Sequence, residues 1–425
     1  MTGNSGLAEM WRHNRVLAAS LIGTAVEFYD FYIYATAASL IFPSLFFPAS
    51  SPTAQLMASY GSLALAFFAR PLGAAIFGHY GDRVGRKATL VASLMLMGGS
   101  TLAIGFLPTY HQIGWWAPLI LCLLRFGQGL GLGGEWSGAA LLAIENAPPG
   151  WRARFGMFPQ LGAPVGFIAA NGLFLILGMT LSDADFFAWG WRLPFIGSAV
   201  LVFLGLWVRL KLTETPEFAA AQAEAPPPAL PIAALFRDHL GAAVAGTFAV
   251  VACFAIYYIA TAFALGYGTT TLKIDRGTFL SLQLGAILFM AGSIVLAGWW
   301  SDRSSPTRVL AWGCVGTVAM GLVFGPLMAS GTLAAIFVAL SLALFLMGFV
   351  YGPLGAYLPA LFPIQLRYTG SSFAFNLGGI IGGALAPIVA TWLIAVQGVG
   401  LVGLYMTAAA AISLGGLWWT AQDRQ

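Results

Sequence analysis

Long apolar stretches dominate this chain and decide what it can fold into. Twelve of them lie at about residues 15–40, 54–77, 88–107, 117–144, 154–179, 193–212, 239–265, 278–300, 309–329, 332–361, 370–396 and 400–420. About 20 apolar residues in a helix cross the ~30 Å hydrocarbon core of a bilayer. Only 8% of the residues are charged and 59% are hydrophobic, too apolar for a water-soluble domain of this length. The pattern predicts an all-α membrane protein with twelve transmembrane helices.

The polar loop between the second and third stretches occurs twice in the chain. Residues 78–87 read GHYGDRVGRK, and residues 298–303, GWWSDR, repeat the Gly-x-x-x-Asp-Arg core of that loop. The two aspartates, Asp82 and Asp302, are 220 residues apart, about half of the 425-residue chain. Tandem halves of this kind are typical of transporters. We therefore expect two pseudo-symmetric six-helix bundles.

A proline-rich connection lies between the sixth and seventh stretches. It contains the segment APPPALP at residues 225–231. Proline cannot continue a helix and makes a semi-rigid spacer. The expected organisation is an N-terminal bundle at residues 1–212, a cytoplasmic linker at 213–238 and a C-terminal bundle at 239–425.

The basic residues are divided unequally between the two sets of loops. Fourteen lie on the side of both termini: Arg12, Arg15, Arg83, Arg86, Lys87, Arg152, Arg154, Arg209, Lys211, Arg237, Arg303, Arg308, Arg367 and Arg424. Only Arg192, Lys273 and Arg276 lie on the other. The positive-inside rule assigns the richer side to the cytoplasm. We expect both termini to be cytoplasmic and the chain to be a multi-pass cell membrane protein, in the inner membrane if the host is Gram-negative.

Other classes of protein find no support in the sequence. The net charge is only +4 and the basic residues are spread over the loops, which argues against a nucleic-acid partner. The four histidines lie at the ends of the stretches or in loops. No Ser/His/Asp or metal-ligand cluster is evident, and no phosphate-binding glycine motif occurs. We expect neither an enzyme nor a cofactor or metal. The expected partners are a small molecule, a proton and the lipid bilayer, with a monomer as the functional unit.

Five ionisable residues lie inside the predicted helices, all in the first half: Glu27, Asp30, Arg70, Arg125 and Glu135. Each costs about 2.5–3.5 kcal/mol at the centre of a membrane helix. Such groups pair with each other, face water or bind a ligand. A purely structural ion pair between Glu27 or Asp30 and one of the arginines is one interpretation.

Their spacing places several of them on common helix faces. Asp30 follows Glu27 by three residues, and Tyr34 follows Asp30 by four, so the three side chains share one face of a helix. Gln128 follows Arg125 by three residues and shares a face with it in the same way. We expect Glu27, Asp30 and Glu135 to couple the proton. The expected substrate contacts are Arg70, Arg125, Gln128 and Tyr34, with Tyr257, Tyr258 and Asn376 as neutral partners from the second half.

The combination of acid and arginine suggests a mechanism of symport. Burial disfavours the charged form of a carboxyl group, and a neighbouring arginine favours it. An anionic substrate that occupies the arginine would leave the acid free to take a proton. The leading interpretation is proton-coupled import of a small organic acid or zwitterion. A neutral-sugar porter and a drug/proton antiporter of the same fold are the alternatives.

Two motifs give a resemblance to a known family. Residues 78–87 resemble the loop 2–3 signature of the major facilitator superfamily (MFS). Residues 125–135, RFGQGLGLGGE, resemble a motif of its metabolite:proton symporters, which carry shikimate, α-ketoglutarate, citrate or proline/betaine. Further matches occur at residues 27–30, 69–73, 190–195, 214–218 and 367–370.

The resemblance implies alternating access by rocking of the two halves. It implies that Asp82 caps the start of the eleventh helix near Gly370–Ser372, and that Arg83 or Arg86 pairs with Glu145. The second copy of the loop departs from the motif after Asp302 and Arg303, so a full second latch is not expected. The expected gating residues are Asp82, Arg83, Arg86, Glu145, Asp302, Arg303 and Arg367.

Overall fold

The structure is a computed structural model. It describes residue 10 and residues 12–48, 51–84, 86–133, 135–211 and 231–422, with the backbone alone at 78–90, 208–211, 231 and 421–422. Every regular element in these residues is helical.

The first half contains helices α2 to α11. Their bounds are α2 Asn14–Leu40, α3 Phe42–Phe46, α4 Pro52–Val84, α5 Arg86–Phe106, α6 Tyr110–Ile113, α7 Trp116–Leu132, α8 Glu135–Glu145, α9 Arg152–Thr180, α10 Asp183–Ala188, a 3-10 turn Gly190–Arg192 and α11 Leu193–Lys211.

The second half contains helices α13 to α22. Their bounds are α13 Pro231–Asp238, α14 Leu240–Tyr258, a π-helical segment Ile259–Phe263, α15 Ala264–Thr270, α16 Arg276–Arg303, α17 Pro306–Ala329, α18 Leu333–Tyr351, α19 Leu354–Tyr357, 3-10 turns Pro359–Leu361 and Ile364–Leu366, α20 Arg367–Gly379, a π-helical segment Ile380–Ala384, α21 Ala386–Gln397 and α22 Gly400–Gln422.

The helices account for all twelve predicted spans. Within the described residues, eleven helical stretches are long and apolar enough to cross a membrane, and the described part of α5, Val91–Phe106, is a shorter twelfth. The predicted span at 117–144 is interrupted, because α7 ends at Leu132 and α8 begins at Glu135. The linker predicted at 213–238 ends in a helix, α13, and residues 212–230 lie outside the described residues.

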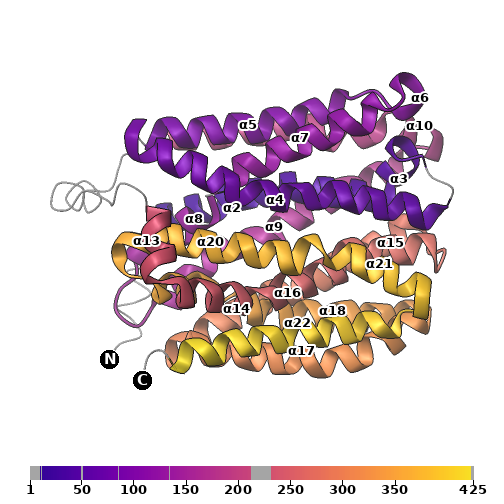
Figure 1. Ribbon diagram of the computed structural model, residues 1–425. Helices are drawn as coiled ribbons and strands as arrows, with labels where there is room; N and C mark the ends of the chain where they lie inside the picture. Colours follow the sequence, from indigo (N-terminus) through magenta and orange to yellow (C-terminus); the bar gives the residue numbers. More distant parts are fainter. Residues whose placement is uncertain are drawn as a thin grey trace.

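Most helices pack within their own half, and the most extensive contacts between the halves form two sets (Figure 1). Helix α2 packs on α9, α4 on α7, α14 on α20 and α22, and α16 on α18. Between the halves, α9 packs along α16, and α4 packs along α20 and α21. The two sets of contacts correspond to each other in the repeat. Each involves a helix, α4 or α16, that ends with the Gly-x-x-x-Asp-Arg sequence.

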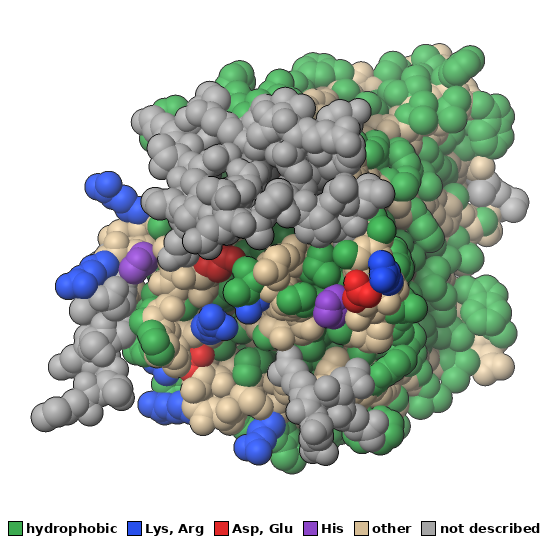
Figure 2. Space-filling model, turned by 60° about the vertical axis from the view of Figure 1, so that its left-hand side comes forward, with side chains coloured by type: hydrophobic (Ala, Val, Ile, Leu, Met, Phe, Trp, Pro, Cys, Tyr) green, Lys and Arg blue, Asp and Glu red, His purple; other side chains and the backbone are tan. Residues whose placement is uncertain are grey.

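The first and last helices reach the same end of the bundle. Helix α2 begins and α22 ends where α11 also ends and α13 begins (Figure 1). We call this the linker end and the opposite one the distal end. Lys and Arg side chains are spread over the linker end, whereas the flank beside it is mostly hydrophobic (Figure 2). That the linker end faces the cytoplasm stays a prediction.

Candidate functional site

Two buried arginines share one aromatic ring inside the first half. The guanidinium carbons of Arg125 on α7 and Arg70 on α4 lie 4.2 and 4.5 Å from the centre of the Phe31 ring on α2. Arg125 also lies 4.1 Å from the Tyr34 ring, and Arg70 lies 5.2 Å from that of Phe67. Stacking on ring faces holds a desolvated cation, at about 2 kcal/mol or more per contact. The electron-rich rings therefore stabilise the arginines without cancelling their charge.

Neither arginine has a carboxylate partner in the described part of the chain. The side chains of Arg70 and Arg125 are 4% and 0% exposed. Nε of both, and Nη2 of Arg125, make no hydrogen bond, and the ion pairs within 4.0 Å involve other residues. The purely structural ion pair with Glu27 or Asp30 is absent from this conformation. The site has positive charge and N–H donors left for a ligand.

A chain of hydrogen bonds joins Arg125 to Asp30. Nη1 of Arg125 donates to Oε1 of Gln128 at 3.0 Å, and Nε2 of Gln128 donates to Oγ1 of Thr101 at 2.7 Å. Oγ1 of Thr101 lies 3.1 Å from Oδ2 of Asp30 and 3.0 Å from the carbonyl of Met97. A hydroxyl has a single proton, so Thr101 donates to one of these oxygens at a time.

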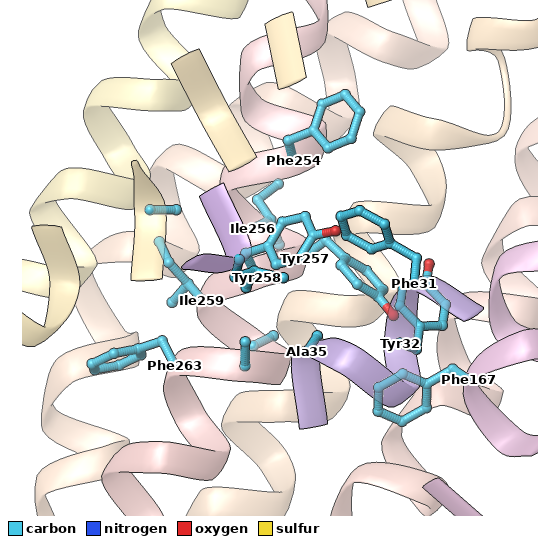
Figure 3. Close-up of a cluster of buried hydrophobic side chains, with 14 of the residues drawn as sticks. Phe31, Tyr32, Ala35, Phe167, Phe254, Ile256, Tyr257, Tyr258, Ile259 and Phe263 are labelled. Atoms are coloured by element: carbon cyan, nitrogen blue, oxygen red, sulfur yellow. The ribbon is translucent and has the colours of Figure 1, made fainter. Parts of the chain in front are cut away.

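Aromatic side chains from both halves meet at Phe31, the ring on which both arginines stack; Figure 3 shows these aromatic residues. Phe31 and Tyr32 of α2 face Tyr257 and Tyr258 of α14. The Tyr32 and Tyr257 rings are stacked with centres 5.2 Å apart, and Phe31 and Tyr258 meet edge to face at 6.1 Å. The cavity lined by Tyr32 and Tyr257 measures only about 10 Å³, room for at most one water. The predicted Tyr257 and Tyr258 thus do lie near the charged groups, which are closed off in this conformation.

The other predicted residues of the first half lie around this cluster. The hydroxyl of Tyr34 is 2.7 Å from that of Ser62. Glu27 is buried in α2, one turn before Asp30. Glu135 opens α8 and accepts a hydrogen bond from Ser93 at 3.2 Å. Of the three predicted acids, Asp30 is the one that the hydrogen-bond chain joins to an arginine.

Two amide side chains cross between the halves on the linker side of the cluster. Nε2 of Gln160 on α9 donates to the carbonyl of Tyr351 at 2.9 Å. Nδ2 of Asn376 on α20 donates to the carbonyl of Gly133 at 2.7 Å. Both carbonyls lie where a helix is interrupted, between α7 and α8 and between α18 and α19. Interrupted helices leave carbonyl groups without intrahelical partners, and an amide of the opposite half satisfies each.

Stacked rings complete this barrier. Trp136 of α8 and Phe375 of α20 lie face to face with centres 3.8 Å apart. Nε1 of Trp136 donates to Oε1 of Gln160 at 2.9 Å, which orients the amide toward Tyr351. In this conformation Asn376, predicted to bind substrate, is part of the barrier.

Asp302 joins the halves at the linker end. Its carboxylate accepts hydrogen bonds from the backbone N–H of Ala153 at 2.8 Å and of Arg154 at 3.1 Å, in the first turn of α9. Nε of Arg154 lies 3.0 Å from the same carboxylate. A negative charge at a helix N-terminus is favoured by the helix dipole. The second copy of the loop therefore forms a contact between the halves through Asp302, whereas Arg303 stacks within its own helix.

The remaining predicted gating residues are placed as follows. The guanidinium carbon of Arg303 lies 3.6 Å from the ring centre of Trp299 in its own helix. Arg367 begins α20, and Glu145 is exposed at the end of α8. The side chains of Asp82, Arg83 and Arg86 lie outside the described residues.

A second barrier closes the distal side of the cluster. The π-helical segment after α14 presents the carbonyl of Ala262, which accepts hydrogen bonds from Oγ of Ser39 at 3.0 Å and from the hydroxyl of Tyr60 at 2.6 Å. Both donors belong to the first half. The described residues therefore show contact between the halves on both sides of the cluster, which is an occluded arrangement.

Comparison with known proteins identifies the family. The chain is 49% identical over 416 residues to the inner membrane metabolite transport protein YhjE of Escherichia coli, covering 97% of this chain and 94% of that protein. The chain belongs to the metabolite transporters of the major facilitator superfamily. It is also 35% identical to the shikimate transporter of E. coli, covering 92% and 90% of the two chains. The sugar (and other) transporter family profile matches residues 16–227.

Solved structures agree with this MFS assignment. The partially occluded, inward-open xylose transporter XylE of E. coli superposes with a TM-score of 0.73 at 15% identity, over 95% of this chain and 96% of that one. The likeness shows the fold. Its membership of the family, shown by the 49% identical relative, makes the chain a multi-pass membrane transporter rather than an enzyme.

Several residues of this MFS carrier's central region were not predicted. Thr101 gave no signal, because a threonine in an apolar helix is ordinary. Both guanidinium groups stack on the ring of Phe31. The sequence did not indicate this, because an aromatic residue in a membrane helix usually serves packing. Gln160 had a usable signal, since it precedes Asn376 by 216 residues, close to the spacing of the repeat.

Proposed function

We propose that this transporter imports a small organic acid or zwitterionic metabolite together with protons. The observation that supports the proposal best is the pair of buried arginines that no carboxylate neutralises in the described residues. An arginine binds a carboxylate through two parallel N–H groups. Two buried cations with no carboxylate in direct contact within the described residues disfavour a cationic drug and give a neutral sugar no charge to match.

The names of the relatives agree with this class of cargo. One is a shikimate transporter, 35% identical, and another is a putative proline/betaine transporter of Staphylococcus aureus, 31% identical over 96% of this chain. Both names describe molecules with a carboxylate.

The Thr101 hydroxyl allows Asp30 to hold or release a proton without losing its hydrogen bond. When Asp30 is charged, Thr101 donates to its carboxylate. When Asp30 is protonated, the acid donates to Thr101, which turns its own proton to the Met97 carbonyl 3.0 Å away. Gln128 donates to Thr101 in both states. An acid cargo bound to Arg125 neutralises the positive charge near Asp30, and the Asp30 carboxylate then takes up a proton more readily.

Uptake into proteoliposomes with an imposed pH gradient tests the proposal. The panel contains shikimate, α-ketoglutarate, citrate, lactate, proline and betaine, each with its methyl ester where one exists, and xylose as the neutral sugar. We expect at least one carboxylate to accumulate when the outside is acidic, and its ester not to. Transport of xylose with no transport of any acid would replace this function with that of a sugar porter.

A further inference from the structure

A cavity of about 270 Å³ lies between the halves at the distal end, apart from the arginine pair. Its walls come from α2, α3, α4 and α10 of the first half and from α15 and α16 of the second. Ser39, one of its lining residues, donates to the Ala262 carbonyl. The distal barrier therefore forms the floor of this cavity, which we call the vestibule.

The vestibule has one charged group and several neutral polar ones. Arg276 is the charged residue among its described lining residues. The polar groups around it are those of Ser39, Ser44, Gln55, Thr269 and Thr270. The other walls are apolar, from Leu40, Pro43, Pro52, Leu56 and Phe187. One guanidinium with hydroxyls and an amide in the same cavity matches a small anion that also has hydrogen-bonding groups of its own.

Arg276 is held in place but is not saturated. Its Nη2 donates to Oδ1 of Asp183 at 2.7 Å, and its guanidinium carbon lies 3.9 Å from the ring centre of Phe186. The Arg276 side chain is 15% exposed and that of Asp183 is 85% exposed. A guanidinium has five N–H donors, and Asp183 receives the one hydrogen bond it makes within the described residues. The ring fixes the orientation of the group and leaves donors for a ligand.

We propose that the vestibule is a binding site for small hydroxylated carboxylates, which occupy Arg276 before they reach the arginine pair. The cargo class follows from the proposed function, and the site itself from the cavity and its cation. The carboxylate takes two N–H groups of Arg276 in place of Asp183, while its hydroxyl groups bond to Ser44, Thr269 or Thr270.

Occupation of the vestibule also changes a contact between the halves. Asp183 belongs to the first half and Arg276 to the second. When a free anion replaces Asp183 on Arg276, this ion pair between the halves is lost. Cargo at this site therefore favours opening of the distal end.

Protection of a cysteine measures occupancy of the vestibule directly. Ser44 is an exposed lining residue, and the natural cysteines are Cys122, Cys253 and Cys314. In a chain with these three replaced by alanine, the S44C variant is labelled with N-ethylmaleimide in detergent. The rate of labelling is measured in the presence of each acid of the uptake panel and, separately, of its methyl ester. We expect the acid, and not the ester, to slow the reaction. S330C, exposed in a distal loop and not part of the lining, should show no protection.

Substitutions in the S44C background assign the effect to the guanidinium. Arg276→Gln should raise the half-protecting concentration at least tenfold, and Arg276→Lys, which keeps the charge without the fork, by less. Asp183→Asn should lower the half-protecting concentration by up to about fivefold, because it removes an exposed ion pair that competes with the ligand for Arg276. Lys273→Gln makes the same charge change three residues away, outside the lining, and should have no effect.

The outcomes separate this site from the proposed function. Equal protection by acid and ester, or protection that persists in Arg276→Gln, would overturn the vestibular site even if the wild-type chain imports an acid. Absence of protection by every acid would do the same. Protection that depends on Arg276, in a chain that imports none of the acids, would support the site and reject the proposed function.

Discussion

Replacement of Asp302 tests how the linker end closes. In the structure its carboxylate accepts two backbone N–H groups of α9 and lies 3.0 Å from Nε of Arg154. Loss of a helix cap costs about 0.5–2 kcal/mol, loss of the charge at the helix terminus about 0.3–1 kcal/mol, and loss of a partly exposed ion pair about 0.2–1 kcal/mol. Asp302→Ala should therefore shift the closed–open equilibrium of the linker end by about 1–4 kcal/mol, roughly a fivefold to thousandfold change in the ratio.

Distances between spin labels at the linker end report this equilibrium. Pro149 and Arg308 are exposed there, on opposite halves. Labels on cysteines at these two positions, in a chain without the natural cysteines, should give a larger population of long distances in Asp302→Ala than in the wild type. Asp302→Asn keeps the size of the side chain and one carbonyl acceptor, so its shift should be intermediate.

Two neighbouring substitutions serve as controls. Arg303→Ala removes a charge from the next residue, whose guanidinium stacks on Trp299 of its own helix, and should leave the distances unchanged. Arg154→Ala removes only the ion-pair component and should have a small effect. If Asp302→Ala and Arg303→Ala behaved alike, a general loss of charge would explain both, and the assignment of the contact to Asp302 would be wrong.

Four further predictions concern the central site and the packing. Arg125→Gln should raise the KM for an acid cargo about a hundredfold, the equivalent of one or two charge-assisted hydrogen bonds; unchanged uptake kinetics would remove Arg125 from the site. Asp30→Asn should abolish the dependence of uptake on an imposed pH gradient in proteoliposomes. In the same assay, Thr101→Val should slow proton-coupled uptake about tenfold, whereas Thr101→Ser, which keeps the hydroxyl, should not. Gly403→Ala places a Cβ 2.0 Å from the carbonyl oxygen of Gly321, so its melting temperature should fall by a few degrees.

Hydropathy and charge predicted the coarse architecture because they respond to the bilayer itself. The length of an apolar helix and the cost of a buried charge are set by the hydrocarbon layer, whatever the neighbouring helices are. The twelve spans and the five interior charges could therefore be found without a structure. The interruption after Leu132 could not, since glycines in a membrane helix serve close packing as often as they mark a break.

Partnerships inside the site were predicted less well, because they depend on how the helices rotate about their axes. Arg70, Arg125, Gln128 and Asp30 do cluster as expected, but through Phe31 and Thr101. The sequence alone offered a direct ion pair as the simplest way to compensate the charges. In the structure, stacking and a hydrogen-bond chain replace it. That difference leaves N–H groups of both arginines without a hydrogen bond in the described residues, as the proposed cargo site requires.

The repeat is preserved in the barriers and lost in the charged site, and the alternating access that the family resemblance implies would explain why. Gln160 and Asn376 are 216 residues apart, their acceptors Gly133 and Tyr351 are 218 apart, and each amide bonds the opposite half. A carrier that rocks must close with both halves, so each half keeps its share of the contacts. A cargo is bound once, and one set of charges suffices at a cost of about 2.5–3.5 kcal/mol for each group. A second set would double that cost without a second cargo to bind, which agrees with the proposal that the C-terminal half contributes the neutral Tyr257 and Tyr258 to the cargo site.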